Sequence, residues 1–305
     1  DIEQSIAQVY IQILYAAESV KVNENTLQVS EAQRDRGKQL LDAGSIARSD
    51  YAQLEAQVST DRYQLVTAQA TLQDYKLQLK QLLELDGEQE MQVYLPALGD
   101  ENVLSPLPTK TDVFRSAVAL RPEIEASKLS VEASELGIGI AKSGYLPSVS
   151  LTAGIGTNHT SGSDFTFGEQ VKNGWNNSIG LSISVPIFNN RQTKSAVEKA
   201  KLQYQTSQLT LLDEQKTLYK TIEGLWLDAN SAQQRYAAAI EKLHSTQTSY
   251  ELVSEQFNAG MKNTVELLTE KNNLLQAQQE LLQSKYMAIL NTQLLKFYQG
   301  DKITL

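Results

Sequence analysis

The chain has 305 residues, of which 41% are hydrophobic and 21% charged, a balance typical of a folded protein rather than a disordered one. Its formal net charge of −9 leaves no basic stripe for phosphates, which argues against nucleic acid as a partner. The lack of cysteine excludes disulfides, thiol catalysis and zinc–thiolate sites. No apolar run is long enough to predict a membrane-spanning helix.

The first predicted element is a helix over residues 1–42 that ends at Ala43-Gly44. A glycine just after the last helical turn is a common C-cap, because it adopts a left-handed backbone conformation at low cost. Ser49 or Asp50 is expected to cap the next helix by accepting hydrogen bonds from its free backbone N–H groups.

The second helix is expected to run to about residue 85 and to be followed by a connector. Residues 87–110 contain three prolines and show little periodicity, as a connector does. Arg121-Pro122 then predicts the start of a further helix that continues to about Ser143, because proline is favoured at the first helical position.

Two segments, 147–157 and 175–187, alternate apolar residues with Ser, Thr and Gly and predict two β-strands. Each alternating core has about nine or ten residues, the length that a tilted strand needs to cross a bilayer. The residues between them, 157–174, are expected to form a polar loop. The pattern alone also fits a soluble hairpin with one face on a core, so both alternatives stay open at this point.

From Arg191 to about Asn258 the pattern is helical, a length of roughly 100 Å at 1.5 Å per residue. Apolar or aromatic residues recur in it every seven positions: Ile222, Ala229, Tyr236, Leu243, Tyr250 and Phe257. The last helix has the same spacing from Leu267 onward. A strict seven-residue repeat predicts helices that supercoil against their neighbours.

The turn at Ala43-Gly44 recurs at Ala259-Gly260, about 216 residues later, and the flanking helices align without a gap. This duplication predicts two repeats: 1–110, a helical hairpin with a connector, and 111–305, a helix, two strands and a long helical hairpin. The first repeat lacks the strands of the second. By that alignment, roughly 100 residues of natural sequence are expected to precede Asp1.

No group of residues predicts catalysis. His159 and His244 are not spaced as a metal pair, and no cysteine or carboxylate cluster completes a site. Gly154-Ile155-Gly156 does not continue as a nucleotide-binding glycine motif. The sequence therefore predicts no enzyme, no metal and no cofactor, and it favours a conduit or a scaffold.

Taken together, these elements resemble those of TolC-like outer-membrane efflux proteins. The resemblance is carried by Arg121-Pro122-Glu123, by the segment 145–151, by the segment 180–188 followed by a long helix, and by the duplicated turns. Each motif is weak alone, but their order and spacing are specific and span nearly the whole chain.

The resemblance implies a mainly α fold with a small β part and a homotrimeric assembly. Duplicated coiled-coil hairpins would form an α-helical tunnel (an α-barrel) in the periplasm, and the β-hairpin would contribute to a trimeric β-barrel in contact with outer-membrane lipid. The implied partners are a periplasmic adaptor protein and an inner-membrane pump, in a Gram-negative bacterium. Because the strands of the first repeat are missing, this chain alone is not expected to close the barrel.

The resemblance also implies that the two turns are the periplasmic tips of the tunnel. Ala43, Gly44, Ala259 and Gly260 would then lie where the adaptor docks and where the tunnel opens like an iris.

Four residues near these turns take the places of the family's gate residues. Lys262 takes that of a basic gating residue, Phe257 that of an aromatic one, and Asp50 that of an acidic residue in tip locking. Glu266 takes the place of an acidic residue that rings the closed aperture. In the best-known member of the family, a second acidic residue forms another ring one turn later. Thr269 stands at that position here, and this departure puts a two-ring selectivity filter in doubt.

Glu266 has a simpler role that is compatible with the first. It lies three residues after Asn263 and can form a capping box with it at the start of the last helix. Three copies of Glu266 near a threefold axis would repel one another and attract cations.

The leading hypothesis is a passive exit duct of a tripartite efflux or secretion system, for drugs, other small molecules or a secreted protein. The alternative is a periplasmic coiled-coil structural or adaptor protein without channel activity, whose helical hairpin looks similar. Adaptors carry a lipoyl-like β-domain between the halves of their hairpin, and this sequence shows none there.

Overall fold

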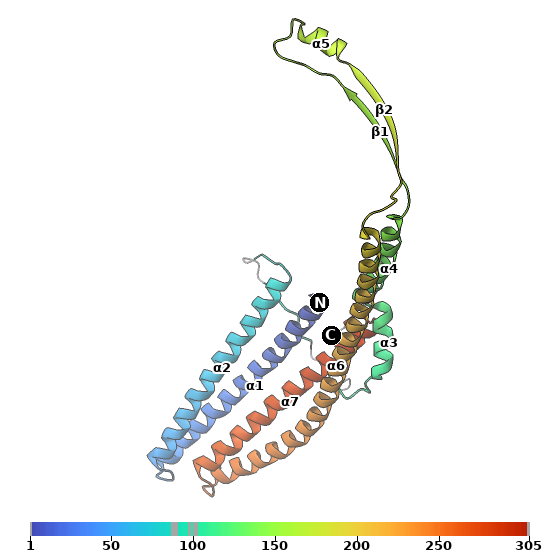
Figure 1. The fold of residues 1–305 in the computed structure, drawn as a ribbon. Helices are drawn as coiled ribbons and strands as arrows, with labels where there is room; N and C mark the ends of the chain where they lie inside the picture. Colours follow the sequence, from blue (N-terminus) through green and yellow to red (C-terminus); the bar gives the residue numbers. More distant parts are fainter. Residues whose placement is uncertain (1, 87–90, 97–98, 100–102, 304–305) are drawn as a thin grey trace. The chain divides into compact units, whose positions relative to one another are not determined.

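The structure is a computed structural model that describes residues 2–86, 91–96, 99 and 103–303. It divides into two compact units (Figure 1): Asp1–Leu120 with Leu218–Leu305, here called the helical unit, and Arg121–Thr217, here called the hairpin unit. These units group the chain by spatial contact, so the expected repeat boundaries stay a prediction. None of the described helices carries an apolar stretch that would cross a membrane.

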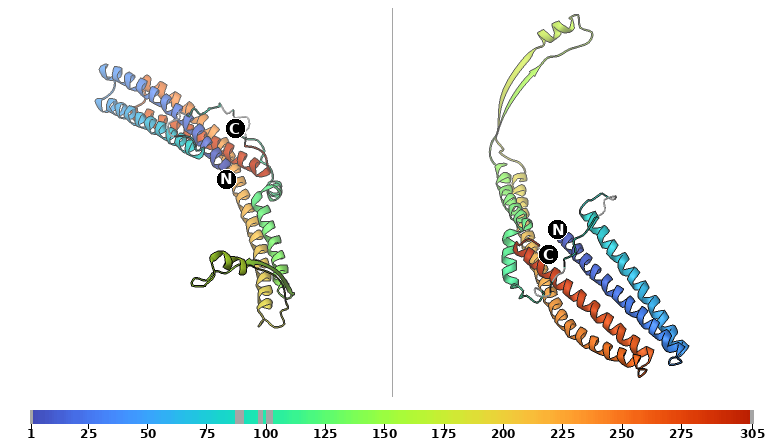
Figure 2. Two further views of the ribbon diagram at one scale, coloured as in Figure 1. Left: turned by 90° about the horizontal axis from the view of Figure 1, so that it is seen from above. Right: turned by 180° about the vertical axis from the view of Figure 1, so that it is seen from behind.

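The helical unit is built from long helices joined in pairs. Its elements are α1 (Ile2–Asp42), α2 (Arg48–Leu82), α3 (Lys110–Leu120), the later part of α6 (Gln192–Asn258) and α7 (Thr264–Gln299). Both views of Figure 2 show α1 folded back on α2, and α7 folded back on α6. The two predicted helical hairpins are thereby confirmed.

The core of the helical unit follows the predicted seven-residue repeat. On α6, Ile222, Ala229, Tyr236 and Phe257 are buried, whereas Leu243 and Tyr250 at the same heptad position are half-buried. One apolar cluster joins α1 to α7 and consists of Ile11, Leu14, Tyr286, Leu290 and Leu294. Burial of this kind is worth about 1.5–3 kcal/mol per large apolar side chain, so these clusters are what hold the helices together.

The connector is held against α6 by side chains of α6 that donate hydrogen bonds to its backbone carbonyls. Gln233 Nε2 donates to the carbonyls of Val103 and Ser105, at 2.8 Å in both cases. Trp226 Nε1 donates to the carbonyl of Pro108 at 3.0 Å. Residues 87–90, 97–98 and 100–102 of the predicted connector lie outside the described residues.

The start of α2 corrects one prediction. The residue that caps this helix is Ala47, which has an extended backbone, and neither Ser49 nor Asp50 occupies that position. Asp50 lies in the first turn instead, where its carboxylate accepts a hydrogen bond from the backbone N–H of Ala47 at 3.3 Å. A carboxylate there also favours the positive end of the helix dipole.

The hairpin unit contains α4 (Pro122–Ser143), β1 (Ser148–Gly156), α5 (Phe167–Asn173), β2 (Asn176–Ser184) and the first part of α6. The two strands are antiparallel, with Ser148 opposite Ser184 and Gly156 opposite Asn176. Both predicted strands are thus confirmed. The polar loop between them is not wholly irregular, because Thr166 and Glu169 form a capping box that starts the short helix α5.

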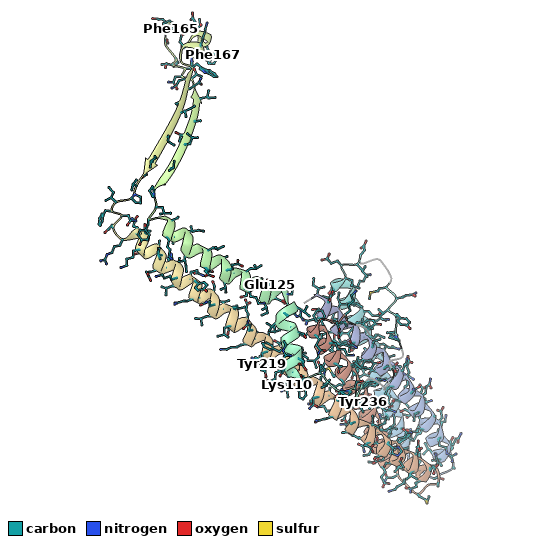
Figure 3. The ribbon with its side chains drawn as sticks, turned by 90° about the vertical axis from the view of Figure 1, so that its right-hand side faces the viewer. Lys110, Glu125, Phe165, Phe167, Tyr219 and Tyr236 are labelled. Atoms are coloured by element: carbon teal, nitrogen blue, oxygen red, sulfur yellow. The ribbon has the colours of Figure 1, made fainter. Side chains whose placement is uncertain are left out.

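Both faces of this two-stranded sheet are exposed, and every residue of β1 and β2 is solvent-accessible. The apolar face reaches 83% exposure at Ile179 and 73% at Leu151. Figure 3 shows Phe165 and Phe167 at the end of the hairpin farther from α4, and these rings are exposed as well. Within the hairpin unit, the described residues therefore do not provide the core that a soluble hairpin would need.

Candidate functional site at the tip turns

The two predicted tip turns are close structural copies. Gly44 has φ of +70° and Gly260 has φ of +74°, both in the left-handed region that favours glycine. In each turn the residue after glycine donates its N–H to a carbonyl five residues back, Ser45 to Leu40 and Met261 to Gln256, both at 2.8 Å. This bond is the one that closes a Schellman motif at a helix end.

Figure 1 shows both turns at the same end of the helical unit, one closing the α1–α2 hairpin and the other the α6–α7 hairpin. The duplicated sequence therefore produces duplicated geometry at one end of the helical unit. Ala43 and Ala259, which precede the glycines, occupy corresponding places in the two turns and donate to Gln39 and Glu255.

Asn263 and Glu266 cap the start of α7 reciprocally. Asn263 Oδ1 accepts from the backbone N–H of Glu266 at 2.9 Å, and Glu266 Oε2 accepts from the backbone N–H of Asn263 at 3.2 Å. The predicted capping box is thus confirmed.

Glu266 also accepts a hydrogen bond from Lys262, with 2.5 Å between Nζ and Oε1. This bond from Lys262, followed by the backbone bond from Asn263, lowers the pKa of the Glu266 carboxyl. The side chains of Lys262 and Glu266 are 36% and 40% exposed. Water and salt therefore reach this pair and weaken it.

Phe257 and Asp50 are joined to neither Lys262 nor Glu266 by a side-chain hydrogen bond or ion pair in the described part of this single chain, and their gate roles stay predictions. Phe257 is 3% exposed and packs against Leu54 of α2 and Leu267 of α7. The carboxylate of Asp50 bonds within its own turn, and in the described part of the chain it is not joined to Lys262. Within one chain, the structure brings Lys262 and Glu266 together but not Lys262 and Asp50.

A buried charged cluster farther along the same helices was not predicted from the sequence. Lys271 of α7 forms an ion pair with Asp61 of α2, and Ser30 of α1 is hydrogen-bonded to both. Lys271, Asp61 and Ser30 are 3%, 1% and 2% exposed. Gln57 donates to the other carboxylate oxygen of Asp61 at 2.8 Å. We call these residues the Ser30–Asp61–Lys271 cluster.

The sequence carries a weak signal for this cluster. Asp61 lies seven residues after the buried Leu54, and Lys271 lies between the buried Leu267 and Leu274. Charges at such core positions of a helical repeat are unusual. Burial lowers the pKa of Lys271, and the hydrogen bond and charge of Asp61 oppose that shift.

Several grooves lie along the helical unit. One of about 470 Å³ between α6 and α7 is lined by small residues and by the charged Asp228, Arg235, Lys242 and Glu280. Lys242 and Glu280 form an exposed ion pair at 2.7 Å. Among the residues that the structure describes, no three His, Asp or Glu side chains come together in a way that could hold a metal.

Comparison with known proteins identifies relatives over most of the chain. It is 26% identical over 298 residues to the outer membrane protein TolC of Escherichia coli K12, covering 93% of this chain and 58% of that protein. It is 24% identical over 283 residues to the outer membrane efflux protein BepC of Brucella suis biovar 1, covering 92% and 59%. The chain thus spans less than two thirds of the length of these relatives.

The fold has solved counterparts. A crystal structure of CusC superposes with a TM-score of 0.82 at 20% identity, covering 98% of this chain and 68% of that one. At this identity the likeness shows the fold alone, and it confirms the mainly α fold with a small β part. The model of the outer membrane efflux protein family matches residues 113–300, more than half of the chain. The chain therefore belongs to the outer membrane efflux protein family, as the sequence resemblance implied.

Proposed function

We propose that this chain is part of a passive exit duct through the outer membrane of a Gram-negative bacterium, in a tripartite efflux or secretion complex. The observation that carries the proposal is the β-hairpin whose two faces are both exposed, within a segment that matches the family. BepC is named as an outer membrane efflux protein, which supports the same role here.

The two faces of the hairpin suit two different surroundings. Val149, Leu151 and Ile179 lie on the apolar face, whereas Ser150 and Thr152 lie on the opposite face. A strand of a transmembrane barrel has the same alternation, with apolar residues toward lipid and polar residues toward the lumen. In the proposed homotrimer, further strands would complete such a barrel.

The proposed partners follow from the tips. The duplicated turns at Gly44 and Gly260 offer an adaptor protein two similar docking points per chain. An inner-membrane pump would supply the energy, because a passive duct does not drive transport by itself. Substrates are proposed only as a class, namely small molecules or a secreted protein.

The proposed gate consists of polar contacts at the tips. Lys262 and Glu266 would bring charge to the aperture, and Asp50 would meet Lys262 of a neighbouring protomer in the closed state. Phe257 would anchor the α6–α7 hairpin against α2, as its burial beside Leu54 supports. Opening would untwist the α6–α7 hairpin and part these contacts.

Single-channel conductance of the full-length protein in planar bilayers tests this gate. The double variant Asp50→Asn/Lys262→Gln is expected to conduct more than the wild type, because both partners of the link lose their charge. Lys242→Gln is the matched control, since Lys242 also belongs to an exposed ion pair of the α6–α7 hairpin. Equal conductance of the double variant and the wild type, with trimers intact, contradicts the gate.

Cell fractionation tests the duct itself. Heat-modifiable trimers in the outer membrane support it. A soluble monomer in the periplasm, or a purified trimer that never conducts, overturns it and favours a structural coiled-coil role.

A further inference from the structure

The seam between the α1–α2 hairpin and the α6–α7 hairpin has two apolar parts. Near the tips, Leu54 of α2 packs against Phe257 and Leu267. At the other end, Ile11 and Leu14 of α1 pack in the cluster that includes Tyr286 of α7. These two clusters share no residue and lie toward opposite ends of the seam.

The Ser30–Asp61–Lys271 cluster lies between these two parts along α7. Its members come from α1, α2 and α7, so it fastens one hairpin to the other. Gln33 of α1 adds a further polar link by donating from Nε2 to the hydroxyl of Tyr250 of α6 at 2.7 Å.

Two grooves lie beside these polar links. A groove of about 80 Å³ is lined by Lys271, Tyr250 and Thr26. A larger one of about 570 Å³ is lined by Tyr250, Gln33 and Phe257. The polar links are therefore flanked by grooves, one of which reaches Phe257 of the tip-side apolar cluster. Leu274, Leu275 and Ala277 of α7 are also buried between the two apolar clusters, so the polar contacts share the middle of the seam with apolar side chains.

We infer that the Ser30–Asp61–Lys271 cluster is the release contact of this seam, a buried charged link that water can replace when the tip-side halves of the two hairpins part. The inference rests on the proposed duct, and it adds to the exposed Lys262–Glu266 pair a second polar element that governs opening.

The physical reason lies in the two states of the seam. A buried ion pair gains roughly as much from its partner as it loses in hydration, so its net contribution in the closed state is small. When the hairpins part, water hydrates both charges again. An apolar pair in the same place would instead expose apolar surface on opening, which is unfavourable. The charged cluster therefore keeps the seam specific when closed and makes it readily separable.

This reasoning predicts opposite effects for single and double substitutions. Asp61→Asn leaves Lys271 buried without a counter-charge, which disfavours the closed seam, so the open probability is expected to rise on the order of tenfold. Asp61→Leu/Lys271→Met replaces the pair by apolar side chains, so the open probability is expected to fall below that of the wild type. A merely structural role would change the stability of the trimer in these two directions but would leave the open probability of assembled channels unchanged.

The experiment records single-channel currents of the full-length protein in planar bilayers, at about 0.1 M and about 1 M salt. The matched control is Lys242→Met/Glu280→Leu, which removes an exposed ion pair outside the seam and is expected to conduct like the wild type. The effect of Asp61→Asn is expected to persist at high salt because the cluster is buried, whereas that of Asp50→Asn/Lys262→Gln is expected to shrink.

Folding is checked by circular dichroism and by the recovery of trimers. Ser30→Ala removes hydrogen bonds but no charge. If Asp61→Asn does not assemble, Ser30→Ala takes its place in the experiment. Ser30→Ala is expected to raise the open probability by a smaller factor than the one expected for Asp61→Asn. If assembled variants conduct like the wild type, or if the single and double variants shift in the same direction, the inference is overturned while the duct stands. A wild-type trimer that does not conduct contradicts the duct itself, and the inference with it.

Discussion

Gly37 of α1 packs closely against Leu54 of α2, and this contact allows a direct test. A Cβ at this position would lie 2.3 Å from Leu54 Cδ1, whereas ordinary contacts lie at 3.4–4 Å. Leu54 cannot easily move away, because it is 1% exposed and packs against Phe257 and Leu267. Gly37→Ala is therefore expected to disturb the contact that joins the two hairpins near the tips.

The magnitude comes from two opposing effects. Alanine is favoured over glycine inside a helix by about 1 kcal/mol. Overpacking of a well-packed core costs about 1–3 kcal/mol. The net loss in free energy of unfolding is therefore expected to be about 1 kcal/mol.

Denaturant unfolding followed by helical circular dichroism measures this loss, in a cycle with Leu54→Ala. In the Leu54→Ala background the clash is absent, so Gly37→Ala is expected to stabilise the protein. Gly224→Ala in α6 is the matched control, because its Cβ would meet nothing within 4 Å. It is expected to stabilise by about 1 kcal/mol. If the effects of Gly37→Ala and Leu54→Ala are simply additive, the reasoning is refuted.

Two further predictions concern pH. The pKa of Glu266 is lowered, so its carboxylate stabilises the folded protein above the unfolded pKa, and this stability is lost as the pH falls through the folded pKa. The thermal midpoints of the wild type and Glu266→Gln are therefore expected to differ at pH 7 and to converge in acid. A difference that stays constant with pH would contradict the Lys262 contact. Burial, with a smaller effect of Glu18, raises the pKa of Tyr286 to about 12. The stability that comes from the neutral phenol is thus complete below pH 10 and lost toward pH 12. Tyr286→Phe is therefore expected to lose less stability than the wild type over that interval. Equal losses would refute the raised pKa of Tyr286.

Much of the fold was predictable because periodicity is a strong signal in long elements. The heptads of α6 predicted four buried residues, with Leu243 and Tyr250 only half-buried. The alternation in the segments 147–157 and 175–187 predicted both strands. Gly44 and Gly260 predicted the two turns, because few other residues accept a left-handed backbone. The resemblance of turns, strands and heptads to one family was likewise confirmed.

The rest depends on short elements or on contacts between distant segments. The helices α3 and α5 have 11 and 7 residues, too few to show a period clearly. Ala47 has no capping side chain, so only the backbone conformation reveals it as the start of α2. The Lys271–Asp61 pair joins residues 210 positions apart, and no local pattern shows that two such charges will meet. The roles of Asp50, Phe257, Lys262 and Glu266 in gating stay predictions.

The exposed hairpin has a consequence for the order in which the protein matures. A two-stranded ribbon without an interior is marginally stable in water, and β1 and β2 are exposed along their whole length. The long helices have cores of their own and can form first. In the proposed trimer, the ribbon would become stable only as other strands and its final surroundings cover it, and its stability would then depend on the concentration of partner chains. Assembly and the completion of folding would thus be a single event for this part of the molecule.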